Sequence, residues 1–122
     1  RLIRAWIVAD AGEFVDPAGI TAQLEGGLIQ AASWSLYETV TYDANGVTSR
    51  DWDTYPILRF NNVPHVHTLL IDRPGEPFLG AGEAVGGPTG GAIANAIRRA
   101  TGLCVSRMPF NQNNIRAAAL KQ

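Results

Sequence analysis

A glycine-rich segment with one carboxylate is the first place in this sequence where chemistry is indicated. The stretch PFLGAGEAVGGPTGGAIANAI, residues 77–97, contains six glycines and a single acidic residue, Glu83. Glycine loses much conformational entropy on folding and adds no side-chain packing, so such a cluster indicates a tight turn, close approach of a ligand, or both. Two roles are open to Glu83: a general base presented by the loop, or a carboxylate that complements the dipole of a following helix.

An earlier segment carries a second candidate surface, on a predicted helix. Asp16 has the side chain of a good N-cap and Pro17 suits the first helical position, and apolar residues then recur at three- and four-residue spacing to about Glu38. One face of this helix combines amides with glycine and carries no bulk: Gln23, Gly26, Gly27 and Gln30. Such a face either admits a polar planar ligand or packs against a second helix through its small residues, and the spacing alone leaves both open.

The remaining pattern predicts a single α+β unit without internal repeats or a low-complexity linker. Two apolar, β-prone runs predict strands, an Asn-Gly pair predicts a hairpin, and a glycine after an alanine-rich run predicts the end of a helix. The predicted elements are a strand at Leu2–Val8, a hairpin around Asn45–Gly46, a strand in PHVHTLLID before Arg73–Gly75, a helix at Gly91–Ala100 capped by Gly102, and a helical turn from Asn114.

Composition places the chain among globular proteins and argues against several partners. The 122 residues are 46% hydrophobic and 17% charged, with a formal net charge of -1. A near-neutral chain without a basic stripe gives no electrostatic case for binding nucleic acid or an anionic membrane. No apolar run approaches the roughly 20 residues that a membrane span requires, so no span is expected. The single cysteine excludes an internal disulfide.

Several familiar site types are disfavoured by spacing. The Gly-Ala-Gly of residues 80–82 begins like a dinucleotide-binding fingerprint, but Val85 stands where the third glycine belongs, and no lysine follows as in a phosphate loop. His65 and His67 share one face of a predicted strand, yet no third ligand is spaced to complete a metal site with them. Cys104 has no basic neighbour to lower its pKa, so we expect an inert, partly buried thiol there.

Three stretches of the chain resemble one enzyme family. VDPAGITAQLEGGLIQAASWSLYE, PFLGAGEAVGGPTGGAIANAIRRATG and RMPFNQNNIRAAAL are similar, in order and spacing, to the C-terminal part of the molybdenum-binding large subunit of the xanthine dehydrogenase and aldehyde oxidase family. The similarity covers nearly the whole chain, and it is greatest to bacterial large subunits of the isoquinoline oxidoreductase or aldehyde dehydrogenase type. Departures are small: Asp16 stands where asparagine often precedes Pro17, and Gly90 and Gly91 replace a pair that is commonly alanine.

The resemblance implies oxidative hydroxylation of an aldehyde or an electron-poor N-heteroaromatic ring, with water as the oxygen source. It implies that Glu83 is the catalytic base, which removes a proton from a water-derived hydroxyl group before its oxygen attacks the substrate carbon. A carboxylate suits that task because it needs only hydrogen-bond reach and a matched pKa. The resemblance assigns no direct metal ligand to this chain, and it implies cofactor contacts at Gln23, which would hydrogen-bond the pterin, and at Gly26, Gly27, Gly82 and Ala84.

The same resemblance sets expectations for cofactors and partners. The complete enzyme would hold a molybdenum–pterin cofactor, as molybdopterin cytosine dinucleotide, with iron–sulfur clusters and a flavin or haem on partners. Residues 1–122 would be a single domain or fragment, the C-terminal part of the molybdenum-cofactor-binding domain. Its partners would be the remainder of that subunit, an iron–sulfur subunit, and a cytochrome or flavin subunit, in a cytoplasmic or periplasmic bacterial enzyme.

An alternative of a different class also fits the sequence: a folded, non-catalytic module that binds or scaffolds the rest of the subunit. In either case the chain alone is expected to expose apolar surface that normally packs against the missing portion. Trp6, Trp34 and Phe78 are the residues expected there.

Overall fold

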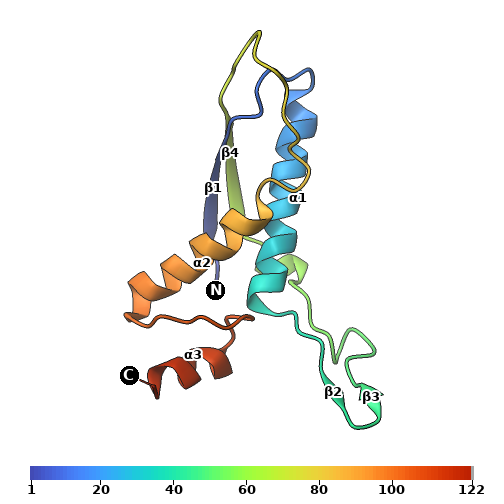
Figure 1. The fold of residues 1–122 in the computed structure, drawn as a ribbon, viewed down its shortest axis with the longest axis vertical. Helices are drawn as coiled ribbons and strands as arrows, with labels where there is room; N and C mark the ends of the chain where they lie inside the picture. Colours follow the sequence, from blue (N-terminus) through green and yellow to red (C-terminus); the bar gives the residue numbers. More distant parts are fainter. Residues whose placement is uncertain (122) are drawn as a thin grey trace.

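The chain folds as an α+β unit, described for residues 1–121 by a computed structural model. One long helix stands beside a pair of strands, a second helix crosses them, and a hairpin projects from the body (Figure 1). The α+β expectation is therefore confirmed. The elements in chain order are β1 (Arg4–Ala9), α1 (Pro17–Leu36), β2 (Tyr42–Asp43), β3 (Gly46–Val47), the 3-10 turn η1 (Phe60–Asn62), β4 (His65–Leu70), α2 (Gly86–Thr101) and α3 (Gln112–Ala119).

The two long strands pair in parallel, with Arg4 opposite His65 and Ala9 opposite Leu70. Both predicted strands are thus confirmed, each within about two residues of its expected bounds. Side chains alternate across a strand, so one face of this pair turns toward α1 and the other away from it. The inward face forms a buried core with α1 and the loop before α2: Ile7, Leu24, Leu28 and Val85.

The start of α1 follows from its local sequence. The Asp16 carboxylate accepts a hydrogen bond from the Gly19 backbone N–H at 2.9 Å, and Pro17 occupies the first turn, where its missing N–H costs nothing. Asp16 is therefore the N-cap, as predicted. The helix ends at Leu36, two residues before the expected end near Glu38.

The start of α2 was predicted wrongly. The sequence favoured a helix from Gly91, whereas α2 begins at Gly86. Pro88 lies in the first turn, which suits a helix start, and Thr89 donates its backbone N–H to the Val85 carbonyl at 3.0 Å. Packing against α1 outweighs the low helix propensity of these glycines, because Thr89, Gly90 and Ile93 are buried. At the other end Gly102 is the predicted cap, in the left-handed conformation at φ 77°.

The predicted hairpin is present but much shorter than expected. Each strand has two residues, and the turn lies at 44–45, because Asp43 pairs with Gly46. The Asp43 carboxylate accepts the Asn45 N–H at 2.7 Å, which closes the turn one residue earlier than an Asn-Gly turn would. All residues of β2 and β3 are exposed, and this arm extends away from the rest of the chain (Figure 1). An isolated two-stranded arm has little packing to extend its pairing.

The C-terminal segment packs back onto the end of α1. The Phe110 N–H donates to the Ser35 carbonyl at 2.6 Å, and a second buried cluster joins Ala32 with Ile93, Val105 and Phe110. Helix α3 begins at Gln112, capped by the Asn111 side chain, so the helical turn predicted from Asn114 starts two residues earlier. Cys104 is exposed, which corrects the expectation of a partly buried thiol.

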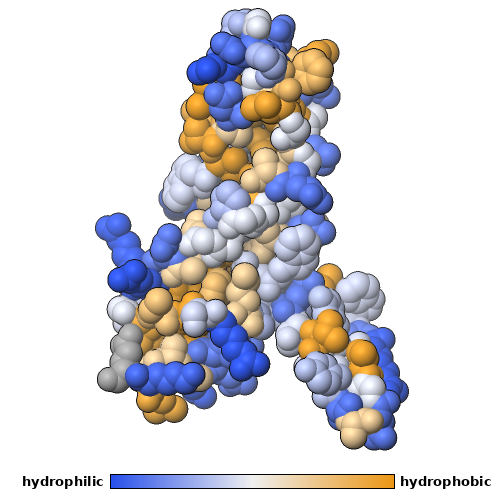
Figure 2. Space-filling view, in the orientation of Figure 1, coloured by the Kyte–Doolittle hydropathy of each residue, from blue (hydrophilic) through white to orange (hydrophobic). Residues whose placement is uncertain are grey.

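Large apolar side chains lie on the surface at the three positions expected. Trp6 is 69% exposed, Trp34 49% and Phe78 86%. Figure 2 shows apolar surface both on the body and on the projecting arm. Among residues 1–121, no helix combines the length and the hydrophobicity needed to cross a membrane.

Candidate functional site

The structure brings together the two segments that the sequence singled out. A Cβ placed on Gly27 would lie 2.7 Å from Val85 Cγ2 and 3.9 Å from the Gly82 carbonyl oxygen. The loop before α2 therefore rests directly on α1 at Gly27, and only a residue without a side chain allows this approach. Val85 is buried against Leu24 and Leu28 of the same helix, which fixes the end of the loop.

The start of the glycine loop is fixed at the far end of β1. The Leu79 N–H donates to the Ala11 carbonyl at 2.8 Å, and the Glu13 N–H donates to the Glu76 carbonyl at 3.2 Å. Gly12 has φ 69°, and a Cβ there would collide with the Pro77 carbonyl, so glycine is required. With both ends held, residues 80–84 form a short span before α2 that is exposed except for Ala81, which is half-buried against the core.

Glu83 lies within this span, two residues before the N-cap of α2. Its backbone carbonyl accepts the Gly86 N–H at 3.2 Å, and its side chain is exposed. The N-cap residue, Val85, supplies no side-chain cap. A carboxylate so placed is available to accept a proton from a ligand above the loop, and it also stands near the positive end of the α2 dipole. Both roles considered from the sequence are geometrically open to it.

Gln23 lies on the same edge of α1 as Gly27, four residues earlier, and its side chain is exposed. The opposite edge of the helix is occupied, because the Thr68 hydroxyl of β4 donates to Glu25 Oε1 at 3.2 Å. By its spacing from Gly27, Gln23 thus lies on the edge of α1 on which the glycine loop rests. An amide offers a donor and an acceptor together, which suits the edge of a heterocycle.

The other predicted contacts divide between open surface and two hollows. A Cβ at Gly26 or Gly82 would meet no atom within 4 Å, so a ligand has room beside both backbones. Ala84 lines a hollow of about 510 Å³ between β1 and α2. Gly26 lines another of about 500 Å³, beside the C-terminal half of α1. The predicted site residues therefore surround the loop without sharing one closed cavity.

The second hollow contains residues that the sequence analysis did not single out. Its walls include Trp52 and Tyr55, next to Trp34, which the sequence analysis had named only as an exposed apolar residue. The Tyr55 hydroxyl donates to Glu38 Oε2 at 2.8 Å. This hydrogen bond raises the pKa of the Tyr55 hydroxyl above its usual value. Trp52 and Tyr55 lie in an irregular loop without periodicity, so only the local density of aromatic residues could have indicated them.

The two strand histidines lie on the outer face of β4, where both are exposed. The His67 ring stacks on Trp6, with 5.8 Å between ring centroids and 19° between planes. Within residues 1–121, no cluster of three or more His, Cys, Asp or Glu side chains is arranged to hold a metal ion.

A bulky, polar, planar group fits the residues present. Gly26 and Gly82 leave open space for it, Gln23 and Glu83 offer exposed polar groups, and the Gly27 contact holds helix and loop in a fixed relationship. The loop is therefore a surface on which a cofactor can rest. Cofactor sites usually bury most of their ligand, so other walls are needed to enclose it.

Comparison with known proteins identifies the class. The fold superposes on part of quinoline 2-oxidoreductase from Pseudomonas putida with a TM-score of 0.82 at 22% identity, covering 96% of this chain and 16% of that one. Helix, glycine loop and strand pair thus have the fold of one part of a much longer chain. Residues 1–64 match the molybdopterin cofactor-binding domain family, and the chain belongs to that family.

Two curated relatives agree with this assignment. The chain is 39% identical over 115 residues to a nicotinate dehydrogenase subunit from Pseudomonas putida, covering 94% of this chain. It is 33% identical over 107 residues to an isoquinoline 1-oxidoreductase subunit from Brevundimonas diminuta, covering 88% of this chain. The chain spans only 10% of the first relative and 14% of the second. The resemblance to molybdenum-binding subunits of the xanthine dehydrogenase and aldehyde oxidase family is thereby confirmed.

Proposed function

We propose that residues 1–122 are the C-terminal part of the molybdenum-cofactor-binding domain of a hydroxylase, and that Glu83 is its catalytic base. The observation that carries this proposal is the contact of Gly27 with Val85 and Gly82. It places the Gly-x-Gly-Glu loop beside the edge of α1 that presents Gln23. Segments far apart in the sequence thereby lie against each other, and membership of a molybdopterin cofactor-binding family is the basis for the ligand that we propose for them.

Each residue has a distinct task in this proposal. The Gln23 amide would hydrogen-bond the pterin edge, and Gly26 would let the ring approach the α1 backbone. Gly27 would contribute to the cofactor site by letting the loop before α2 rest on the helix beside the ring. Gly82 and Ala84 would border the metal end of the cofactor, because neither carries bulk that would exclude it. Glu83, between them in the loop, would present its carboxylate there.

Glu83 acts by holding and moving a proton. The bound cofactor supplies oxygen transfer and two-electron redox chemistry, and this chain contributes binding, orientation and the base. The Glu83 carboxylate accepts the proton released as a water-derived oxygen is transferred to substrate. Enclosure by the rest of the subunit strengthens its electrostatic effect, because water is then excluded from the site.

The names of the curated relatives support both substrate classes, and the proposal keeps both. The relatives from Pseudomonas putida and Brevundimonas diminuta carry names of enzymes that act on nitrogen-containing rings, nicotinate and isoquinoline. A relative from Gluconacetobacter polyoxogenes, 36% identical over 110 residues, is instead named as an aldehyde dehydrogenase. The first two names also designate subunits, which supports assembly with partner chains. We propose that the complete enzyme carries the cytosine dinucleotide form of the cofactor and passes electrons to an iron–sulfur subunit, and then to a flavin or haem group.

Oxygen labelling tests this function. The complete enzyme is supplied with nicotinate, isoquinoline and benzaldehyde as probes in water enriched in oxygen-18, and products are analysed by mass spectrometry. We expect label in the product of at least one of the three probes, in proportion to the bound molybdenum. Product oxygen derived from dioxygen, or turnover independent of molybdenum, would contradict the proposal. Absence of turnover on every probe by a molybdenum-loaded enzyme would favour the non-catalytic module.

A further inference from the structure

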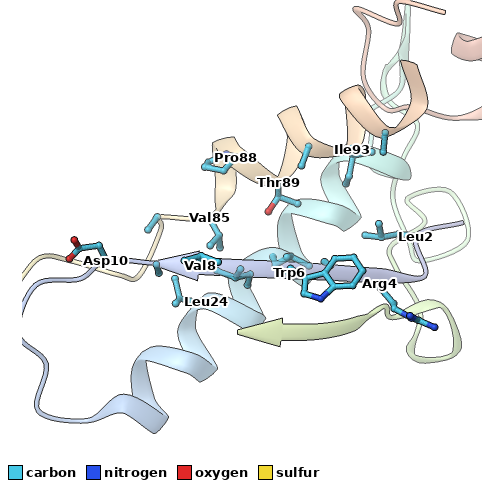
Figure 3. Close-up of a pocket in the computed structure, with 17 residues that line it drawn as sticks. Leu2, Arg4, Trp6, Val8, Asp10, Leu24, Val85, Pro88, Thr89 and Ile93 are labelled. Carbon is cyan, nitrogen blue, oxygen red and sulfur yellow. The ribbon is translucent and has the colours of Figure 1, made fainter. Parts of the chain in front are cut away.

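The hollow between β1 and α2 runs along a strand edge. Its lining comes from β1, from Leu24 and Leu28 of α1, and from Ala84 and one side of α2; β4 contributes nothing to it. The hollow therefore lies on the side of β1 away from β4, with α2 as its far wall (Figure 3). Its volume of about 510 Å³ is open to solvent along β1.

The backbone of β1 has hydrogen-bonding groups directed to this side. The His65 N–H donates to the Ile3 carbonyl at 3.0 Å, and the Ile71 N–H donates to the Ala9 carbonyl at 2.8 Å. Odd-numbered residues of β1 thus direct their backbone groups toward β4. Because these groups alternate along a strand, those of Arg4, Trp6 and Val8 point the other way. Among residues 1–121, β4 is the one strand paired with β1.

The surroundings of this edge match a strand with apolar residues at alternating positions. The floor is formed by Ile7, Leu28 and Val85, which belong to the buried core. The far wall carries small side chains one helical turn apart, at Pro88, Ala92 and Ala96, which leave room between α2 and β1. Parallel sheets are ordinarily covered on both faces and rarely consist of two strands alone.

We propose that the free edge of β1 is a docking site for a third strand, supplied by the remainder of the same subunit. The relatives provide such a polypeptide, because this chain spans 10% and 14% of their length. A second copy of the chain is a poorer fit. Its β1 carries its own α2 along the same edge, so joining two β1 edges would bring the two α2 helices into conflict.

This inference goes beyond the proposed function and does not require Glu83 to be catalytic. It predicts a definite hydrogen-bonding pattern in the complete subunit. The amides of Arg4, Trp6 and Val8 pair with the docked strand, so every amide of β1 is held in a ladder. Without the docked strand, protection from exchange alternates along β1.

Residue-resolved hydrogen–deuterium exchange on the complete subunit tests the proposal. We expect the amides of Arg4, Trp6 and Val8 to be as slow as those of Ala5 and Ile7, and at least about 100-fold slower than in unstructured peptide. Alternating fast and slow amides would overturn the proposal, whether a helix covers the sheet face or nothing does. The isolated chain is the second arm of the test. If its Arg4, Trp6 and Val8 amides show the same protection, and this protection arises together with dimerisation, the occupant is a second copy and the proposal is wrong.

A matched pair of substitutions identifies the groove as the cause. Ala92→Trp fills the space between α2 and β1, whereas Ala100→Trp places the same side chain at an exposed position of α2 outside the groove. Ala92→Trp should speed exchange at Arg4, Trp6 and Val8 at least about 10-fold by weakening local protection, and Ala100→Trp should not. Equal exchange rates at Arg4, Trp6 and Val8 in the two variants would contradict strand docking in this groove. If Ala92→Trp does not fold, the exchange pattern of the unmodified subunit decides.

Discussion

Gly26 and Gly27 are adjacent in α1 but have opposite surroundings. A Cβ on Gly27 would lie 2.7 Å from Val85 Cγ2, whereas one on Gly26 would meet nothing within 4 Å. Gly27 is therefore glycine because the loop before α2 packs on it. No contact within the described residues requires glycine at position 26. We therefore expect the missing side chain of Gly26 to serve a contact with a group outside this chain.

The two glycines should differ in their effect on stability. Gly26→Ala should raise the free energy of unfolding by up to about 1 kcal/mol, because alanine favours the helix. Gly27→Ala should lower it by about 1–2 kcal/mol, because the gain in propensity is smaller than the cost of displacing Val85. Urea denaturation of the chain measures both. Equal stabilisation by the two substitutions would show that the loop does not pack on α1 at Gly27.

Cofactor retention should depend on Gln23. In the complete enzyme, Gln23→Ala should remove the hydrogen bond that we propose between Gln23 and the pterin, worth about 0.5–1.5 kcal/mol. Molybdenum content after dialysis should fall, while turnover per bound molybdenum changes less. Gln112→Ala, at an exposed position in the first turn of α3, is the control. Unchanged molybdenum content in the Gln23 variant would contradict a cofactor contact at Gln23. This edge of α1 would then serve only for packing.

The chain by itself should neither retain the cofactor nor remain monomeric. The loop and one edge of α1 leave a ligand open on several sides, and exposed Trp6 and Phe78 favour association. Elemental analysis should find no stoichiometric molybdenum, and size exclusion should show species larger than 13.1 kDa. Trp6→Ser with Phe78→Ser should reduce the association. A monomer that copurifies with equimolar molybdenum would show that these residues form most of the site.

The Tyr55–Glu38 contact should make stability fall at alkaline pH. The Glu38 carboxylate raises the pKa of Tyr55 above its ordinary 10.0 in the folded chain. The contact therefore stabilises the fold fully below the ordinary pKa, and this contribution is lost as pH rises through the raised value. Ultraviolet titration of tyrosine ionisation measures the shift, with Tyr55→Phe identifying the signal. Glu38→Gln should return the pKa of Tyr55 toward 10.0, and an unchanged titration would contradict the contact.

Local features of the fold were predictable because their causes lie within a few residues. Asp16 caps α1 through a bond to Gly19, and Gly102 ends α2 in a conformation that glycine adopts easily. The start of α2 was not predictable in this way. Gly86 and Gly87 have low helix propensity, and burial of the following turn against α1 makes them helical.

The arrangement of the candidate site depended on contacts between distant segments. Periodicity identified the Gln23 and Gly27 edge and composition identified the Glu83 loop, but neither predicts that Val85 lies on Gly27. Resemblance to a family joined the two segments in advance of the structure. The hollow at Tyr55 lacked such a guide, because its residues come from an irregular loop and the end of α1.

Turnover per bound molybdenum in the Glu83→Gln variant of the complete enzyme tests the central claim most directly. Glutamine keeps the shape of the side chain but cannot accept the proton. Loss of one positioned base typically slows a reaction about 100-fold to 10,000-fold. We expect a loss in that range with molybdenum content near normal, and little effect from Glu76→Gln, an exposed glutamate before the same loop. Turnover of the Glu83 variant within a few-fold of the unmodified enzyme would contradict the assignment of Glu83 as the base.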